Sequence, residues 1–510
     1  MRKFYLTTAI DYPNALPHIG TAYEKVCADI IARYKRLGGW DTFFVMGSDE
    51  HSHNVERAAR EQGLEPRQFT DIIAPKFEQI WKMLNISYDC FERSSSQRHK
   101  KAVQDIFQKI YDAGDIYKGH YEGWYCNSCE RFYQEKDLIE NKECPHHKRP
   151  VEWVKEENYI FALSRYREKL LDLLQEDHQF AMPEARRNEM LSFLKMGLDD
   201  VSVSRASVSW GIPLPFDPSH MVYVWFDALI CYVSGIGYGE DPDKFSKYWP
   251  ADVHIIGKDI TRFHCVMWPA MLMSAGIDLP RMVWAHGFVH LGGEKLSKSA
   301  GLSVDPIEAA ERHGADALRY YLVREIPFDR DGNFAWEKFD ERYDSDLANN
   351  LGNLLQRSIA MIQKYCNGEI PTPAKLDSSD TEVVDFQQET YKNVCADLDQ
   401  YRLSFALGNI WTFITRCNKY IEESAPWELK KDPAKKEKLN TVLGNLARAI
   451  KFIGGAIAPF MPETAEKVWT QIGLGDQFAA FKYADLSQLQ PIPAGTRVLK
   501  PVPLFPKTVE

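Results

Sequence analysis

Residues 4–37 read FYLTTAIDYPNALPHIGTAYEKVCADIIARYKRL, and this stretch decides the fold. Phe4 to Ile10 is rich in β-branched and aromatic residues, which favours a buried strand. A loop containing Pro13 and Pro17 follows, and apolar residues then recur with helical spacing from about Gly20 to Leu37. A strand, a loop and a helix in this order predict the opening unit of an α/β domain.

The same unit returns along the chain. Strand-like runs at Thr42–Met46, Val253–Ile256 and Met282–Ala285 each end at a glycine or a polar cluster. Strands that alternate with helices predict a doubly wound parallel sheet of the Rossmann type, whose ligands bind beyond the carboxyl ends of the strands. The fold class is therefore α/β, with an insertion in the sheet domain and an all-α helical bundle after it.

The domain boundaries follow from changes in composition. We expect the two halves of the sheet domain at 1–116 and 214–285, the cysteine-bearing insertion at 117–213, a connector at 286–343, the helical bundle at 344–490 and an extended tail at 491–510. Within the bundle, the apolar spacing predicts helices over Asp346–Lys364, Val383–Leu403, Leu407–Glu422 and Leu439–Ile457.

Composition narrows the function classes. The 510 residues include 62 Lys and Arg against 72 Asp and Glu, which gives a net charge of −10. This charge excludes a uniformly basic nucleic-acid-binding protein. A polyanionic ligand would therefore have to bind at a local basic patch. Ten cysteines without a disulfide-like framework indicate a reducing compartment. No signal peptide or membrane-length apolar stretch is apparent, so we expect a cytoplasmic protein without a membrane span.

Two short motifs are suited to phosphate chemistry. His18-Ile19-Gly20-Thr21 opens the first helix, where orphan amides, a glycine and an imidazole can approach a phosphate, although such a motif alone is more often an ordinary loop. Residues 292–301 read GGEKLSKSAG, a glycine-flanked loop whose lysines can close over a polyphosphate, although a lysine-rich loop by itself is usually solvated.

A third motif is typical of a metal site. Cys126, Cys129, Cys144 and His147 form two pairs, each with two intervening residues, and this spacing predicts one structural Zn²⁺ with four protein ligands and no open position for catalysis. His146 could replace His147. The alternative is a set of buried free thiols.

The first two motifs together resemble the two sequence signatures of the class I aminoacyl-tRNA synthetases, and further blocks resemble the methionyl-tRNA synthetase family. The similarity extends from Phe4 to the closing block Leu504-Phe505-Pro506. The other blocks are Ile10-Asp11-Tyr12-Pro13-Asn14, Gly47-Ser48-Asp49-Glu50-His51, Tyr223-Val224-Trp225-Phe226-Asp227-Ala228, Gly257-Lys258-Asp259-Ile260 with His264, and Trp268-Pro269-Ala270.

The resemblance implies a methionine–tRNA ligase that forms methionyl-adenylate and pyrophosphate from L-methionine and ATP, then transfers methionine to the initiator and elongator forms of tRNA(Met). A carboxylate nucleophile needs no Ser or Cys, so positioning and charge stabilisation would provide the catalysis. His18 and Lys298 would hold the phosphates of ATP, which Mg²⁺ would accompany, and Lys295 would support loop closure. The remaining residues of the ATP site would be Gly20, Thr21, Glu24, Gly257, Asp259 and His286.

The methionine site is also implied by the resemblance. Asp49 would bind the α-amino group, and a pocket of apolar and aromatic side chains would suit a polarizable thioether. That pocket would comprise Ile10, Tyr12, Trp225, Ala228, Leu229, Tyr232, Ile260 and His264. From periodicity alone, Trp225 and Tyr232 would be assigned to core packing.

The helical part would read the anticodon. Asn353 and Arg357 are four residues apart on one helix face, and with Trp427 they offer hydrogen bonds and stacking to unpaired bases. The resemblance assigns the CAU anticodon to these three residues, and the connector at 286–343 to the tRNA stem. The plainer alternatives are a solvated helix face and, for Trp427, an anchor of the bundle.

Two departures from the family pattern leave alternatives open. Thr21 stands where many members have a second histidine, and Leu296 stands where many have methionine. Because of Thr21, a non-catalytic tRNA-binding paralogue is one alternative. A synthetase for another apolar or sulfur-containing amino acid is the other alternative. Because the chain stops at the closing block, we also expect a monomer.

Overall fold

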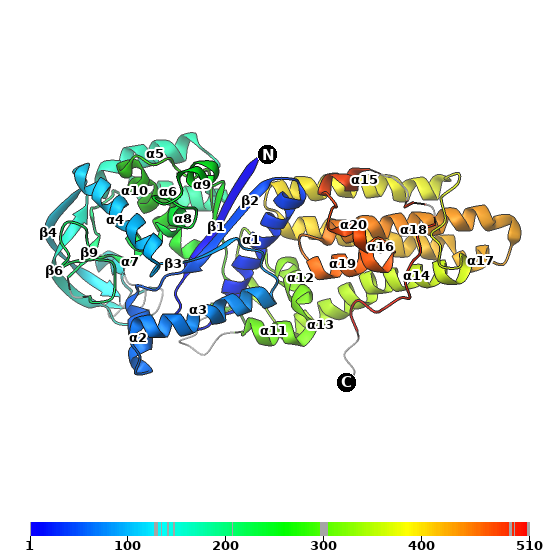
Figure 1. Ribbon diagram of the computed structural model, residues 1–510, viewed down its shortest axis with the longest axis horizontal. Helices are drawn as coiled ribbons and strands as arrows, with labels where there is room; N and C mark the ends of the chain where they lie inside the picture. Colours follow the sequence, from blue (N-terminus) through cyan, green and yellow to red (C-terminus); the bar gives the residue numbers. More distant parts are fainter. Residues whose placement is uncertain are drawn as a thin grey trace.

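The computed structural model describes residues 2–126, 131–133, 135–139, 142–145, 148–206, 208–295, 304–488, 492, 493 and 495–506. A sheet domain lies at one end and a helical bundle at the other, as Figure 1 shows. No helix within these ranges is both long enough and apolar enough to cross a bilayer.

The centre of the sheet domain is a six-stranded parallel sheet in the order β3-β2-β1-β11-β12-β7. The predicted strands are confirmed, each within about two residues of its observed bounds. The strands are β1 (Lys3–Asp11), β2 (Asp41–Ser48), β3 (Cys90–Arg93), β7 (Ala181–Met182), β11 (Val253–Gly257) and β12 (Val283–His286).

Helices cover both faces of this sheet. Successive β1 residues point to opposite faces, so Phe4 and Leu6 share a core with α1, whereas Tyr5 belongs to the core on the α4 side. Because both faces are buried, the strands carry nearly continuous apolar runs, and the doubly wound prediction is confirmed. The helices around the sheet are α1 (Ile19–Leu37), α2 (His53–Glu61), α3 (Pro66–Met83), α4 (Gln97–Asp112), α5 (Arg167–Glu176), α6 (Glu184–Lys195), α7 (Val224–Ala228), α8 (Cys231–Ser234), α9 (Pro242–Tyr248) and α10 (Trp268–Ala275).

The segment predicted as an insertion contains a second, antiparallel sheet in the order β5-β4-β6-β8. Strand β7 also lies within 117–213, yet it pairs with β12 and forms an edge of the central sheet. Two residues are too short to give a periodic pattern, so the sequence did not reveal this return to the sheet. The smaller strands are β4 (Ile116–Cys126), β5 (Arg131–Tyr133), β6 (Glu152–Phe161), β8 (Val201–Ser202), β9 (Ser204–Arg205) and β10 (Met221–Val222).

The connector and the bundle follow. The first predicted bundle helix differs from the observed one, because Tyr343–Gly352 forms π-helical turns (η7) before α14 begins. The connector holds β13 (Val289–Leu291), β14 (Glu294–Lys295), α11 (Pro306–His313), α12 (Ala315–Glu325), β15 (Gly332–Phe334) and α13 (Trp336–Arg342). The bundle holds α14 (Asn353–Tyr365), α15 (Ser378–Asp399), α16 (Leu403–Ser424), α17 (Pro426–Leu429), α18 (Lys436–Ile457), α19 (Pro462–Gln471) and α20 (Gly475–Phe478).

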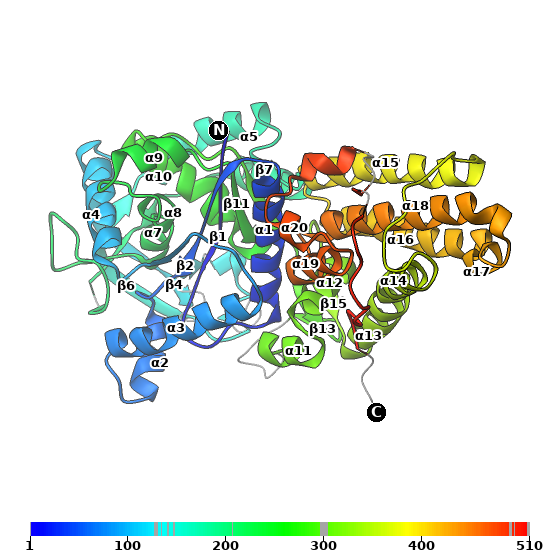
Figure 2. The ribbon, with the colours of Figure 1, turned by 45° about the vertical axis from the view of Figure 1, so that its right-hand side comes forward.

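A buried ion pair joins α1 of the sheet domain to α12 of the connector. Helix α1 lies between the sheet and the bundle (Figure 2), and Arg319 on α12 places Nη2 2.6 Å from Oδ2 of Asp29 on α1. Both side chains are fully buried. Arg319 also donates to the carbonyls of Leu84, Pro459 and Phe460, so one guanidinium links α1, the end of α3 and the α18–α19 turn.

We expect Arg319→Met to lower the free energy of unfolding by about 3–5 kcal/mol, because it leaves Asp29 and three carbonyls buried without this partner. Urea denaturation measures the change. Arg312→Met is the matched control: Arg312 pairs with Asp340 at the surface, so its loss should cost less than about 1 kcal/mol. Equal effects of the two substitutions would contradict the role of the buried pair.

Candidate functional site

The strand order reverses on either side of β1. From β1 the chain goes to β2 and β3 on one side, and β11 and β12 lie on the other. In an open parallel sheet, ligands bind in the crevice at this switch point, beyond the carboxyl ends of the strands. Here those ends are Asp11, Ser48, Gly257 and His286.

A cavity of about 240 Å³ lies at this point. It is lined by every predicted ATP-site residue that the structure describes, namely His18, Gly20, Thr21, Glu24, Gly257, Asp259 and His286. Ala9, Asp11, Ile260, Phe288 and Val289 complete the lining. Residues from the first helix and from two strands more than two hundred positions later thus meet around one cavity.

His18 caps α1 with its own side chain. The backbone N–H of Thr21 donates to Nδ1 of His18 at 3.1 Å, so the neutral imidazole carries its proton on Nε2. The Oγ1 of Thr21 lies 3.4 Å from the same Nδ1. This arrangement fixes the ring at the mouth of the helix, where Nε2 is the donor.

The lysine-rich loop lies mostly outside the described residues. Lys298 is among the residues not described, and of Lys295 the structure gives only the backbone at the end of β14. Val304, the first described residue after the loop, accepts a hydrogen bond of 2.9 Å from the backbone N–H of Ile19. The chain therefore returns from this loop directly beside the first turn of α1.

Glu24 is held as a buried carboxylate. Its Oε2 lies 3.0 Å from Nε2 of His286, and its Oε1 lies 2.8 Å from Nζ of Lys25. Burial by itself would raise the pKa of Glu24, but the charge of Lys25 and the hydrogen bond with His286 lower it to about 2. The polar side of the cavity therefore keeps a fixed negative charge at neutral pH.

An aromatic cluster at the predicted methionine pocket lies next to this cavity, which Ile260 also lines. The rings of Trp225 and Phe263 stack with centroids 3.9 Å apart and planes 7° from parallel, and the ring of Tyr12 meets Trp225 edge-on at 6.0 Å. Four other predicted pocket residues belong to the same apolar core, namely Ile10, Leu229, Tyr232 and Ile260. His264 contacts Tyr232, and Ala228 is buried on α7. Phe263 was not among the predicted residues, although it adjoins His264 in the sequence.

His264 is neutral and its orientation is fixed. Its Nδ1 donates to the carbonyl of Ile260 at 3.0 Å, so Nε2 accepts from the hydroxyl of Tyr232 at 2.7 Å. Burial lowers the pKa of His264 to about 4. The pocket therefore carries no imidazolium charge at neutral pH, which suits an uncharged thioether.

Asp49 follows β2 and is hydrogen-bonded to Asp11, which lines the cavity. It is buried, and its backbone N–H donates to the carbonyl of Asp11 at 2.8 Å. The preceding Gly47 allows β3 to approach, because a Cβ at this position would lie 2.0 Å from the carbonyl oxygen of Glu92. Asp49 is thus carried on a loop that the neighbouring strands hold closely.

A second buried carboxylate ties this loop to the pocket helix. Asp227 on α7 lies 2.7 Å from Nδ1 of His51 and 2.5 Å from Nε2 of His99. Burial alone would raise the pKa of Asp227, but His51 and then His99 lower it to about 2. Asp227 therefore links the loop bearing Asp49 to the helix bearing Trp225, a role that the sequence reading did not assign.

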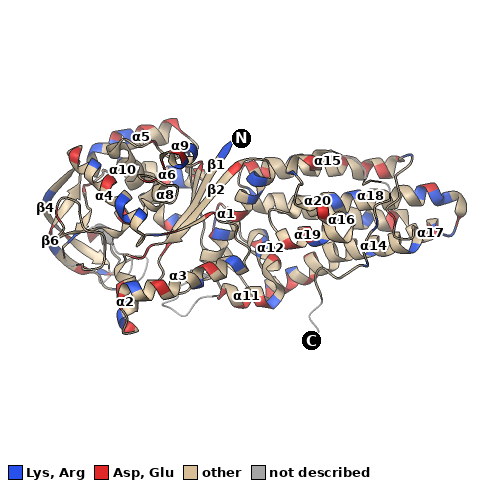
Figure 3. Cartoon of the chain, in the orientation of Figure 1, with Lys and Arg blue, Asp and Glu red and all other residues tan. Residues whose placement is uncertain are grey.

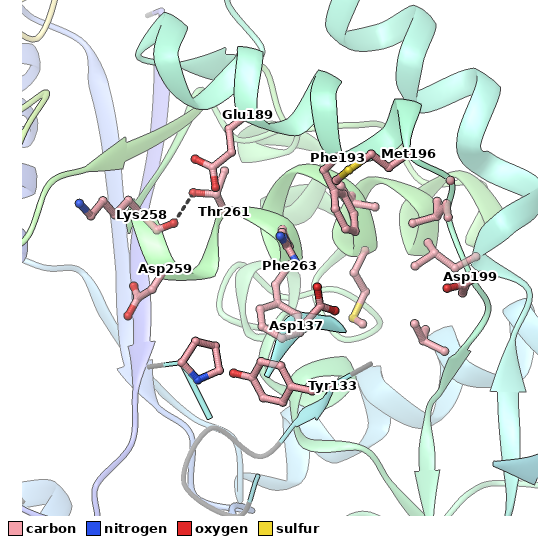
Figure 4. A pocket seen from close by; sticks show the side chains of 18 of the residues that line it. Tyr133, Asp137, Glu189, Phe193, Met196, Asp199, Lys258, Asp259, Thr261 and Phe263 are labelled. Atoms are coloured by element: carbon pink, nitrogen blue, oxygen red, sulfur yellow. Dashed lines mark hydrogen bonds between the residues drawn. The ribbon is translucent and has the colours of Figure 1, made fainter. Parts of the chain in front are cut away.

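A larger hollow of about 790 Å³ opens beside the cavity and shares Asp259 and Phe288 with it. Figure 4 shows Glu189 and Phe193 of α6 on one side, opposite Tyr133 and Asp137 of the insertion. Phe263 lines this hollow while its ring stacks on Trp225, so the hollow reaches the wall of the aromatic pocket.

Two of the four predicted zinc ligands are described. Cys126 and Cys144 are buried in one small cluster with Tyr133 and Val151. Cys129 and His147 lie outside the described residues, as does His146. Among the residues that are described, three or more His, Cys, Asp or Glu side chains do not gather in a metal-binding group.

The predicted anticodon residues meet far from the cavity. The guanidinium of Arg357 on α14 lies 6.0 Å from the ring centroid of Trp427 on α17, and it pairs with Glu422 at 2.7 Å. Asn353 stands one turn before Arg357 at the start of α14. Trp427 on α17 is 37% exposed, more than a bundle anchor would be. Figure 3 shows Lys and Arg around α17, at the end of the bundle distant from the sheet.

The sheet, the cavity at its switch point and the appended bundle are those of a class I aminoacyl-tRNA synthetase. The family described as "tRNA synthetases class I (M)" matches residues 4–152 and 136–359, and the "Anticodon-binding domain of tRNA ligase" matches residues 380–499. The chain belongs to the methionyl-tRNA synthetase family.

Relatives and solved structures agree over nearly the whole chain. The methionine–tRNA ligases of Caldanaerobacter subterraneus and Thermotoga maritima are 47% and 46% identical over 99% of this chain, and the match covers 79% and 80% of their own lengths. The Mycobacterium tuberculosis methionyl-tRNA synthetase in complex with methionyl-adenylate is 40% identical and superposes with a TM-score of 0.96, covering 99% of this chain and 100% of that one. Its apo form gives 0.87 at 38% identity, covering 100% and 99%. The monomer stays a prediction.

Proposed function

We propose that this protein is a methionine–tRNA ligase that activates L-methionine with ATP and transfers it to initiator and elongator tRNA(Met). The observation that carries the proposal is the junction of two sites at the β1–β11 switch point. Ile260 lines the polar cavity, and its carbonyl orients His264 of the aromatic pocket. A nucleotide in the cavity and an apolar amino acid in the aromatic pocket could therefore bring the α-phosphate and the carboxylate into contact.

In the first step a methionine carboxylate oxygen attacks the α-phosphorus of ATP. The new bond is an acyl–phosphate bond, and the bond to the β-phosphate oxygen breaks so that pyrophosphate leaves with the electron pair. His18 is suited to the phosphates because its cap geometry leaves Nε2–H as a donor. Lys298 and Lys295 would add positive charge from the loop, and Mg²⁺ would accompany ATP as part of the substrate.

The methionine side chain would lie against the Trp225–Phe263 stack. A thioether packs favourably against aromatic ring edges, and the Tyr232–His264 pair gives the pocket a polar but uncharged end. Asp49 would accept the α-ammonium group, since a carboxylate pairs with a cation at the pocket border. The remaining predicted contacts are Ile10, Tyr12, Ala228 and Leu229.

The tRNA would be bound at two distant places. Asn353, Arg357 and Trp427 would bind anticodon bases at the distal end of the bundle, with Lys430 and Lys431 nearby for phosphates. The acceptor end would enter the larger hollow, where aromatic side chains and Lys258 and Arg262 line the approach to the adenylate. There a ribose hydroxyl of the terminal nucleotide would attack the methionyl carbonyl carbon, and AMP would leave.

A structural zinc ion would complete the insertion. Cys126 and Cys144 fit this role because both thiols are buried in the same cluster, as two members of a closed tetrahedral site would be. Cys129 and His147 would supply the other two ligands. This function accords with the expected division of the chain into catalytic, zinc-bearing and anticodon-binding parts. It also accords with a cytoplasmic location.

The activity is tested by ATP–pyrophosphate exchange with each of the twenty amino acids. We expect exchange with methionine, and a KM for ATP in Thr21→His within about tenfold of the native value, because His18 remains. Preference for another amino acid would contradict the proposal. If exchange is slow and Thr21→His makes it faster, then Thr21 lowers the rate of activation. Binding of tRNA without any exchange would favour the non-catalytic alternative.

Trp427→Ala should raise the KM for tRNA(Met) in aminoacylation by roughly 5- to 150-fold, the loss of one base–aromatic stack, while exchange stays unchanged. Phe405→Ala is the matched control, because Phe405 is an exposed aromatic residue of the same bundle. A similar KM in both variants would contradict the anticodon role of Trp427.

Metal analysis of the purified protein should find about one zinc ion per chain, the stoichiometry of a single closed site. Cys144→Ala should lose the metal and lower the melting temperature. Cys417→Ala, which removes a buried thiol of α16, should keep it. Absence of zinc from the unmodified protein would favour the free-thiol alternative.

A further inference from the structure

A fully buried lysine lies behind the nucleotide cavity. Lys25 is on α1 next to Glu24, and its side chain has no exposed surface. A lone ammonium is costly to bury, so such a lysine persists only where anionic partners or functional demands hold it. The proposed reaction as described above does not use it.

The partners of Lys25 are two carboxylates and one carbonyl. Its Nζ lies 2.8 Å from Oε1 of Glu24 and 3.1 Å from Oδ2 of Asp11, and it donates to the carbonyl oxygen of Ala9 at 2.9 Å. Glu24 and Asp11 both line the nucleotide cavity. One cation therefore offsets one of the two negative charges on the wall that a polyanionic nucleotide would face.

The backbone of Ala9 is bonded by both Glu24 and Lys25. The register between β1 and β2 runs from Thr7 opposite Val45 to Ile10 opposite Gly47, so β1 has one extra residue. This bulge withdraws Ala9 from the ladder with β2, and its N–H donates instead to Oε1 of Glu24 at 3.1 Å. Glu24 and Lys25 thus satisfy both backbone groups of Ala9 and hold the bulge that leads into Ile10 and Tyr12.

The charged groups around Glu24 come from several elements. Lys25 and Asp11 are in contact with one another, and His286 on β12 contacts Glu24. Asp259 and His18 line the same cavity, and His264 and Tyr232 lie in the adjoining pocket. Burial alone would lower the pKa of Lys25, but Asp11 and Glu24 raise it above its ordinary value, so Lys25 stays charged. Among these groups, Lys25 is the largest influence that lowers the pKa of Glu24.

We propose that Lys25 is a positioning residue of the nucleotide site: its positive charge reduces the combined negative charge of Asp11 and Glu24 so that ATP can bind beside them, and it holds the β1 bulge. The inference rests on the proposed function. Lys25 would not touch ATP, since its Nζ faces Ala9 and the two carboxylates. Its effect would pass through their charge and through the backbone that they order.

The test is the KM for ATP in methionine-dependent pyrophosphate exchange, measured from about pH 5.5 to about pH 8.5, a range in which an ordinary Glu stays ionised. In the native protein Glu24 stays ionised and paired, so it should add no ionisation to the profile. In Lys25→Gln, an amide can still donate to Ala9, but the cation is gone and burial raises the pKa of Glu24. As pH rises through that pKa, Glu24 acquires an unbalanced negative charge.

We therefore expect the KM for ATP in Lys25→Gln to rise with pH and to exceed the native value at least about tenfold at the alkaline end, the factor that 1.4 kcal/mol of repulsion produces. Lys25→Arg, which keeps the charge, should have the native profile. In Glu24→Gln/Lys25→Gln the rise with pH should shrink, because one of the two carboxylates is gone.

Lys35→Gln is the matched control. Lys35 lies on the same helix, but its Nζ pairs at 2.8 Å with Asp399 of α15, away from the cavity, so its ATP profile should match the native one. A KM for ATP in Lys25→Gln within about twofold of native across the pH range would overturn the inference, since it leaves no room for a charge effect. The same rise persisting undiminished in Glu24→Gln/Lys25→Gln would also overturn it.

If Lys25→Gln alone does not fold, the comparison moves to Glu24→Gln against Glu24→Gln/Lys25→Gln, where Asp11 is the remaining carboxylate. The double variant should have a KM for ATP at least about threefold higher, and equal values would overturn the inference. Failure of the proposed function is a separate result, because the native protein would then show no methionine-dependent exchange.

Discussion

The position of β1 between β2 and β11 is the constraint on which the rest of the structure depends. Because the chain winds away from β1 in both directions, the loops that follow β1, β2, β11 and β12 cannot all cover the sheet, and an open crevice remains at their carboxyl ends. The cap of α1, the Asp49 loop, Gly257 and His286 all face that crevice. The bulge in β1 occurs there as well, so the strand that creates the crevice also shapes its wall.

The buried carboxylates around this crevice have partners close by. Glu24 and Asp11 share Lys25, and Asp227 is held by His51 and His99. Behind them, Asp29 pairs with Arg319 and fixes α1 against the bundle. An unpaired charge at any of these positions would lower the stability of the fold, because the interior has a low dielectric constant. Each pair therefore fixes the position of the elements that carry it. Glu24, Lys25 and Asp29 all lie on α1, so this helix connects the cavity wall to the helical domain.

The order of strands and helices in the sheet domain could be predicted from the sequence, because it depends on local sequence pattern. The strand–loop–helix order predicted the parallel sheet. His18, Gly20, Glu24 and Gly257 were assigned to one site by the resemblance to the synthetase family, and they line one cavity. Long-range partners could not be predicted in this way. A lysine and an arginine within helical patterns would be expected at a solvated surface, and only the fold shows that Lys25 and Arg319 are buried against specific carboxylates. Phe263, Asp227 and the two-residue strand β7 were missed for the same reason: what defines each of them is a contact with residues distant in the chain.

The most direct test of the account is a crystal structure of the protein with a non-hydrolysable analogue of methionyl-adenylate. The account predicts the adenosine in the cavity lined by Gly20, Glu24, Gly257 and His286, with the methionine side chain against Trp225 and Phe263 and the α-amino group at Asp49. The junction between the two parts should lie at Ile260. An analogue bound instead in the larger hollow between α6 and the insertion, with the switch-point cavity left unchanged, would contradict it.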